Sequence, residues 1–161
     1  MAKTTIEVKE TNARHALLVI SIVALMSFLG VLTETSMNVT FPTLMHDFNV
    51  SLTTVQWVTS GYLLAAALIM LSSAYMKRRF TNRQLFVTAA LLFIIGDLMC
   101  ALAPVFWVLL AGRLVQAGCV GLCSPLMVNI ILDTVPTSKL GTYMGVANLI
   151  ILIGPALGPT F

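Results

Sequence analysis

The chain alternates long apolar stretches with short polar connections. Crossing the hydrocarbon core of a bilayer as a helix takes about 20 mostly apolar residues. Five stretches meet this requirement, and we place them at Ala16–Thr40, Thr54–Met76, Gln84–Ala103, Trp107–Leu132 and Leu140–Phe161. Because the connections are short, the pattern predicts one continuous transmembrane helical domain over 15–161, preceded by a polar tail over 1–14.

Composition supports a membrane protein over a soluble one. The chain is 58% hydrophobic and 9% charged, and its mean hydropathy is +0.97, whereas a soluble domain has about 25% charged residues. A soluble all-α bundle of this composition would have too few polar residues to cover its surface. The first stretch is too long for a cleavable signal peptide and has no small-residue cleavage pattern.

The positive charges gather at the ends of the apolar stretches. The second connection is the most basic, with Lys77, Arg78, Arg79 and Arg83. The first connection (45–53) and the third (104–107) contain no Lys or Arg. The positive-inside rule therefore predicts a multi-pass membrane protein with its N-terminus and second connection in the cytoplasm. The net charge of +3 follows from this distribution and does not indicate a nucleic-acid partner.

Three charged residues lie inside the apolar stretches: Glu34, Asp97 and Arg113. Each costs at least about 2.5–3.5 kcal/mol at the bilayer centre, so such residues are candidates for function. Measured from the stretch ends, all three fall in the outer half of the membrane at a similar depth. We therefore expect acid and base to compensate each other inside the bundle.

Two interpretations of these charges remain open. Glu34 and Arg113 are candidates for proton coupling or substrate binding, and the alternative is a static structural pair. For Asp97, which lies nearer the end of its stretch, a structural or snorkelling role is favoured over a place in a cavity.

Neighbouring polar residues support an inward face for these charges. One stripe at helical spacing contains Ser27, Gly30, Glu34 and Asn38. In the fourth stretch, Arg113 and Gln116 share a face. Asn38 and Gln116 are therefore candidates to line a cavity.

Aromatic residues near the outer ends of the stretches suggest interfacial anchors. Trp57, Tyr62 and Trp107 fit this description, since amphipathic rings prefer the headgroup level. A place in a cavity lining is the alternative for Tyr62 and for the neighbouring Gln56.

The fifth stretch ends in an unusual run, Gly154-Pro155-Ala156-Leu157-Gly158-Pro159. A proline inside a soluble helix costs about 3 kcal/mol, but neighbouring helices in a membrane can satisfy the freed backbone groups. The two Gly-Pro pairs predict a kinked helix, thin on one side, that packs closely against a partner. The chain contains no motif for hydrolysis, nucleotide binding or metal ligation, so we expect no enzyme, cofactor or metal.

In this order, the motifs resemble the major facilitator superfamily, and more narrowly the fourteen-helix drug:proton antiporters, with the lincomycin-resistance-like multidrug exporters as the nearest group. The resemblance rests on four segments: Glu34 to Pro42 in the first helix, Gln56-Trp57 with Tyr62 in the second, Arg113-x-x-Gln116 in the fourth, and Gly154 to Pro159 in the fifth. It covers essentially the whole chain after Arg14.

Two departures from the family pattern affect which residue roles of the family can be expected in this chain. Glu34 stands one place later than the usual first-helix carboxylate, at the position after Thr33. The basic connection usually reads G-x-L-x-D-x-x-G-R, and the acidic residue and both glycines are absent from this chain. The gating ion pair usually attributed to that connection is therefore in doubt.

The resemblance implies proton-coupled efflux of hydrophobic, often cationic drugs, with lipid, protons and further helices of the same transporter as partners. The fold it implies has two six-helix halves with the substrate path between them. About five helices correspond to an incomplete N-terminal half, so we expect the chain to be part of a longer exporter. The alternatives are a truncated, non-transporting membrane subunit or remnant, and a carrier of another small solute.

Overall fold

The computed structural model describes the backbone of residues 2–157 and the side chains of 18–73, 75–137 and 139–156. All elements in this part of the chain are helical, and they are α1 (Ala2–Val39), α2 (Phe41–Phe48), α3 (Leu52–Arg79), α4 (Asn82–Ala101), α5 (Phe106–Thr134), a short 3-10 helix η1 (Thr137–Lys139) and α6 (Leu140–Leu157). The prediction of an all-α membrane protein is confirmed.

Among the described residues, four segments are long and apolar enough to cross a membrane: Leu18–Val39, Leu52–Ser73, Asn82–Ala101 and Phe106–Thr134. The fifth predicted stretch forms a shorter apolar helix, Leu140–Ala156. Pro155 lies inside this helix, whereas Gly158 and Pro159 lie outside the described residues.

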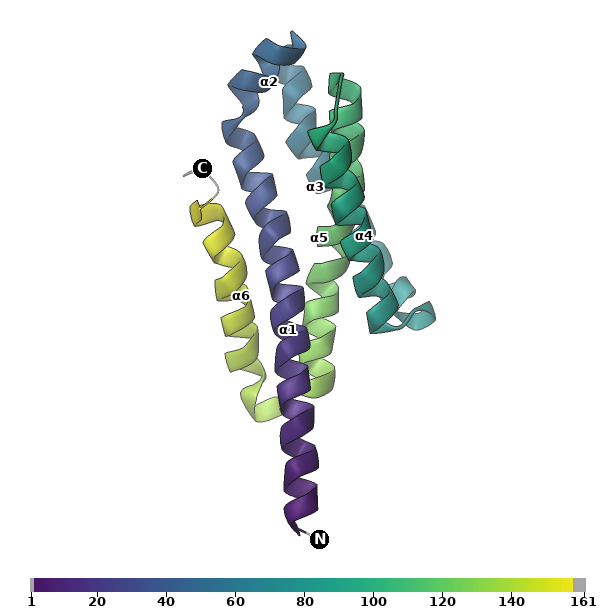
Figure 1. Cartoon of the computed structure of the whole chain (residues 1–161), viewed down its shortest axis with the longest axis vertical. Helices are drawn as coiled ribbons and strands as arrows, with labels where there is room; N and C mark the ends of the chain where they lie inside the picture. Colours follow the sequence, from purple (N-terminus) through teal and green to yellow (C-terminus); the bar gives the residue numbers. More distant parts are fainter. Residues whose placement is uncertain (1, 158–161) are drawn as a thin grey trace.

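The N-terminal segment, which the sequence analysis predicts as a polar tail, has a helical backbone. Helix α1 begins at Ala2 and continues without a break into the first span. Its first turns project beyond the other helices (Figure 1). Residues 2–17 contain no glycine or proline, so nothing in the covalent chain stops the helix there.

Between the first two spans the structure forms a short helix, α2, where the sequence analysis placed a connection. Pro42 occupies its first turn, a position at which the missing N–H has no helical partner. Asn49 ends it in the left-handed conformation, with φ of 49°, which asparagine tolerates better than most residues.

Local sequence explains where the next helices begin. Ser51 caps α3 by accepting a hydrogen bond from the backbone N–H of Thr54. Thr81 and Gln84 form a reciprocal capping box at the start of α4. Helix α5 ends just before Pro136, because the residue preceding a proline is driven to extended backbone.

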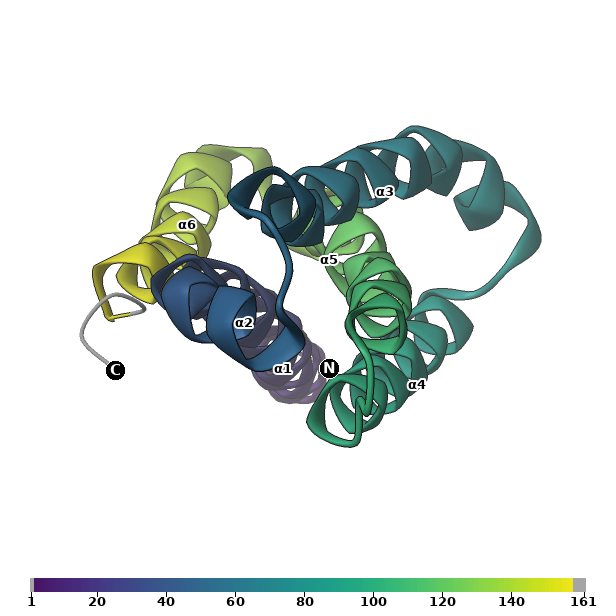
Figure 2. The same ribbon diagram turned by 90° about the horizontal axis from the view of Figure 1, so that it is seen from above.

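Helix α5 is the centre of the bundle. In its membrane-spanning segment 61% of the residues are buried, against 17–28% in the other three. Helices α3 and α4 pack on separate sides of α5, while α1 contacts α5 and also carries α6 (Figure 2). The N-terminus and the α3–α4 connection lie toward one end, and α2 and the α4–α5 connection lie at the other (Figure 1).

Glycines set the closest helix contacts. A Cβ on Gly96 of α4 would lie 2.8 Å from the carbonyl oxygen of Gly112 of α5. Gly154 of α6 faces the α1 backbone, where its Cβ would lie 3.4 Å from the Leu32 nitrogen. Gly154 thus lies in ordinary van der Waals contact with α1, and the kink and close packing of the fifth helix stay predictions.

Candidate coupling site in the helix bundle

The centre of the candidate site is Arg113, a charged side chain only 1% exposed. Helix α5 positions it against α3, where its guanidinium carbon lies 4.5 Å from the centroid of the Tyr62 ring. The negative face of an aromatic ring attracts a cation at this distance, which offsets part of the cost of burying the charge.

Tyr62 is fully buried, so its interpretation as an interfacial anchor is wrong. Its hydroxyl donates to the backbone carbonyl of Gly30 in α1 at 3.5 Å. Tyr62 shares a helical face with Val55, Val58 and Ala66, which are also buried. This spacing is the sequence signal that identifies it as an inward residue.

Gln116 links Arg113 to Asp97 across two helices. The Arg113 Nη1 donates to Gln116 Oε1 at 2.6 Å, and Gln116 Nε2 donates to Asp97 Oδ1 at 2.6 Å. Gln116 is 1% exposed and Asp97 is half-buried. Asp97 therefore points to the α4–α5 contact, and the snorkelling interpretation does not match its position.

Part of the Arg113 guanidinium is left without a partner. Its Nε and Nη2 atoms are buried and make no hydrogen bond to the described residues. A buried donor without an acceptor is costly, and most buried polar groups in proteins are paired. The site therefore retains capacity to bind an acceptor.

Glu34 lies near this cluster but outside its hydrogen-bond chain. Arg113 interacts electrostatically with both Glu34 and Asp97, yet the ion pairs found within 4.0 Å among the described side chains are His46–Asp47 and Lys77–Asp133. The expected compensation of acid by base thus runs through Gln116 for Asp97, and it is longer-ranged for half-buried Glu34.

The remainder of the α1 stripe is divided between the interior and the surface. Ser27 and Gly30 are buried, and Ser27 donates to the carbonyl of Val23. Asn38 is exposed and accepts a hydrogen bond from Thr59 of α3 at 2.9 Å. Gln56 is also exposed, in the first turns of α3, and the structure does not bring it to the Arg113 contacts.

The two tryptophans lie on the surface of the bundle. Trp57 is 57% exposed and Trp107 is 70% exposed. These positions agree with the anchor interpretation, which remains a prediction.

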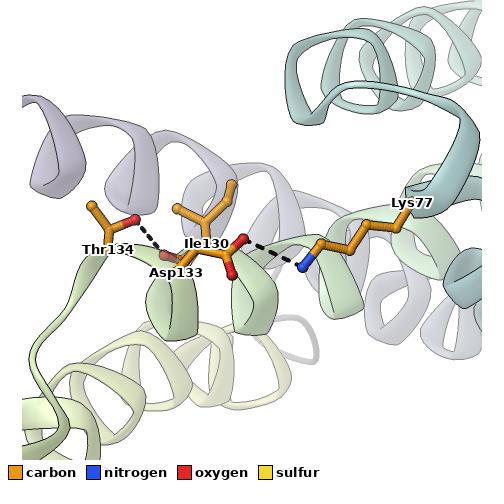
Figure 3. Close-up of polar contacts among 4 residues, drawn as sticks. All are labelled: Lys77, Ile130, Asp133 and Thr134. Atoms are coloured by element: carbon orange, nitrogen blue, oxygen red, sulfur yellow. Dashed lines mark hydrogen bonds and ion pairs between the residues drawn. The ribbon is translucent and has the colours of Figure 1, made fainter.

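The basic connection makes a contact that the sequence did not suggest. Lys77 Nζ lies 3.3 Å from Asp133 Oδ2, so the end of α3 is tied to the end of α5 (Figure 3). Next to Asp133, the Thr134 hydroxyl donates to the Ile130 carbonyl within the last turn of α5 (Figure 3). Arg78, Arg79 and Arg83 are exposed.

Comparison with known proteins gives the family. The sequence profile of the Major Facilitator Superfamily matches residues 23–161. The chain is 40% identical over 94% of its length to the uncharacterized MFS-type transporter YhcA of Bacillus subtilis. It is 43% identical over 85% of its length to the lincomycin resistance protein LmrB of the same organism, and 33% identical over 73% to the multidrug resistance protein B homolog of Mycobacterium tuberculosis.

These matches cover only part of the relatives. The chain spans 29% of the length of YhcA and of LmrB, and 22% of the Mycobacterium protein. No solved structure matches the chain. The profile nevertheless covers most of the chain and agrees with its apolar helices, which place it in a membrane. The chain belongs to the major facilitator superfamily of membrane transporters.

Proposed function

We propose that this chain contributes the N-terminal helices of a proton-coupled exporter of hydrophobic, often cationic drugs. The observation that carries the proposal is a buried arginine, Arg113, with two unpartnered nitrogens in an apolar span near the Glu34 carboxylate. Relatives named for lincomycin resistance and multidrug resistance support the substrate class. The plasma membrane and a cytoplasmic N-terminus are part of the same proposal.

In this mechanism Glu34 exchanges a proton for a substrate cation. A carboxylate in an apolar bundle can be neutralised by a proton, by Arg113 or by a cationic substrate, and these partners compete. A proton entering from outside neutralises Glu34, and its release inside frees the carboxylate for the next substrate. Between these events the positive charge of Arg113 is available to interact with the Glu34 carboxylate.

The packing of α6 on α1 supplies a place for movement. Gly154 removes the side chain at the contact, and Pro155 interrupts the backbone ladder of α6 beside it. Alternating access in such transporters is rocking of packed helix bundles around a fixed site. We assign Gly154 and Pro155 to this contact. The exposed Asn38 and Gln56 are proposed to face the substrate path.

The experiment is a chimera, because the chain matches 29% of LmrB. This chain replaces the matching segment of the B. subtilis protein, in cells that lack their own drug exporters. We expect lincomycin resistance, and proton-driven efflux of a fluorescent cationic dye from everted vesicles. In the chimera, Glu34→Gln should abolish efflux while membrane insertion is unchanged, because the amide cannot exchange a proton.

Asp47→Asn is the matched control for the loss of a carboxylate. Asp47 is exposed in α2 and pairs only with the neighbouring His46 among the described side chains. This variant should transport normally. Full dye efflux by Glu34→Gln at a fixed pH gradient would remove Glu34 from the mechanism.

A further inference from the structure

We propose that Asp97 is a positioning residue for Arg113, acting through the side-chain amide of Gln116. The three side chains form one chain of hydrogen bonds, with 2.6 Å between Arg113 Nη1 and Gln116 Oε1 and 2.6 Å between Gln116 Nε2 and Asp97 Oδ1. The structural part of the proposal rests on this geometry, and its meaning for transport rests on the proposed export function.

The donors and acceptors of the three side chains fix the direction of these hydrogen bonds. A guanidinium only donates hydrogen bonds, an ionised carboxylate only accepts them, and an amide does both. Gln116 between Arg113 and ionised Asp97 must therefore turn its nitrogen to the carboxylate and its oxygen to the guanidinium. Asp97 anchors the nitrogen end of this amide and so holds its oxygen in place for Arg113, without touching Arg113 itself.

The backbone holds the two helices at the distance that these bonds require. Gly96 precedes Asp97 and Gly112 precedes Arg113, and the two glycines meet at the α4–α5 contact. A Cβ on Gly96 would lie 2.8 Å from the Gly112 carbonyl oxygen and 2.9 Å from the Gln116 nitrogen. The contact has no room for a side chain, and this close approach lets the short Asp97 side chain reach Gln116.

The consequence concerns the rest of the guanidinium. With Nη1 held by Gln116 and the guanidinium carbon 4.5 Å from the centroid of the Tyr62 ring, the orientation of Nε and Nη2 is restricted. These are the two buried atoms without a partner, and Glu34 is the charged group that approaches Arg113 from α1. Asp97 thereby sets how Arg113 is presented to Glu34 or to a substrate.

The test observes Arg113 directly and needs no transport. In the 15N-labelled chain in lipid nanodiscs, the buried Arg113 Nε–H should give a slowly exchanging signal, which Arg113→Lys identifies by removing it. Arg78, Arg79 and Arg83 should exchange faster, since they are exposed. Asp97→Leu should move the signal and speed its exchange at least about tenfold, because the amide is no longer anchored at its nitrogen end.

Further variants separate positioning from a general loss of structure. Gln116→Leu should change the signal as Asp97→Leu does, and the double variant should add nothing, because both act through one chain of bonds. Asp97→Asn keeps the size of the side chain but adds donors, so it should shift the signal in the same direction by a smaller amount. Asp133→Leu removes an exposed carboxylate at the far end of α5 and should leave the signal unchanged.

An unchanged Arg113 signal in Asp97→Leu or in Asp97→Asn, with wild-type helicity by circular dichroism, would overturn the proposal. The same substitutions in the LmrB chimera test the functional part separately. A moved Arg113 signal together with reduced proton-driven efflux supports both parts. A moved signal with normal efflux supports the positioning and counts against the role of Arg113 in export.

Discussion

At the scale of single residues, the difficulty in this bundle is the charge of Arg113. An unpaired charge in an apolar interior is strongly unfavourable, and three kinds of contact offset this cost. The face of Tyr62 lies under the guanidinium, Gln116 accepts from Nη1, and Glu34 and Asp97 supply negative charge nearby. Removing any one of these contacts should lower the free energy of unfolding by the amount that the contact contributes.

Substitutions of Tyr62 separate the ring from the hydroxyl. Tyr62→Phe keeps the aromatic face and loses only the 3.5 Å bond to Gly30, so we expect a loss of at most about 1 kcal/mol. Tyr62→Leu removes the ring from beneath Arg113 as well, and we expect a loss of more than about 2 kcal/mol. Unfolding of the purified chain by SDS in mixed micelles measures both, and equal losses would show that the ring contributes nothing to Arg113.

How much of the site was predictable differs from residue to residue. Charges inside apolar stretches stand out in a sequence, so Glu34, Asp97 and Arg113 could be identified by their cost alone. Tyr62 carries no such cost, and because an aromatic residue near a helix end also fits an interfacial anchor, only its helical spacing with Val55, Val58 and Ala66 marks it as inward. The link through Gln116 depends on the rotation of α4 against α5, which hydropathy does not encode.

At the scale of helices, glycine positions decide which surfaces meet. Gly96 and Gly112 bring α4 and α5 into backbone contact, whereas a Cβ on Gly141 at the start of α6 would meet nothing within 4 Å. All three are glycines in apolar helices, so the sequence alone does not distinguish Gly96 and Gly112 from Gly141. Their different roles appear only when the helices are packed together.

Gly96 and Gly141 provide a matched pair of substitutions. Gly96→Ala places its Cβ against backbone atoms of α5, which cannot move aside as a flexible side chain would. We expect a loss of about 1–3 kcal/mol from this overpacking. Gly141→Ala should be neutral or stabilise by up to about 1 kcal/mol, because alanine favours the helix and meets no neighbour. SDS unfolding of the two variants measures the difference, and equal effects would contradict close packing of α4 on α5.

The boundaries of the helices followed from local sequence more closely than their contacts did. The spans over α3, α4 and α5 were predicted to within a few residues, because caps and prolines act locally. Helix α2 was missed, since eight residues next to a proline resemble a connection. The helix through residues 2–17 was missed because polar composition alone does not distinguish a helix from a tail.

At the scale of the whole molecule, the sequence gives an order of helices but not their neighbours. A helix that faces lipid is as apolar as one that faces protein, so hydropathy cannot place α5 at the centre. The structure places α5 there and leaves α6 in contact chiefly with α1. In this arrangement the basic ends of α3 and α4 lie at the same end of the bundle as the N-terminus (Figure 1).

This shared end determines how the bundle should be oriented in the membrane. Lys77, Arg78 and Arg79 occupy the last turn of α3, so the positive-inside rule places this end in the cytoplasm. In cells that express the chain, Arg79→Cys should then resist a membrane-impermeant maleimide until the membrane is opened. Val105→Cys, exposed at the opposite end before α5, should react in intact cells. The unsubstituted chain is the control, because Cys119 and Cys123 are buried and Cys100 is half-buried.

The reverse labelling pattern would invert the bundle and place the outer ends of α1 and α4, with Glu34 and Asp97, toward the cytoplasm. Proton entry to Glu34 from outside requires the predicted orientation, so the proposed direction of coupling depends on this result.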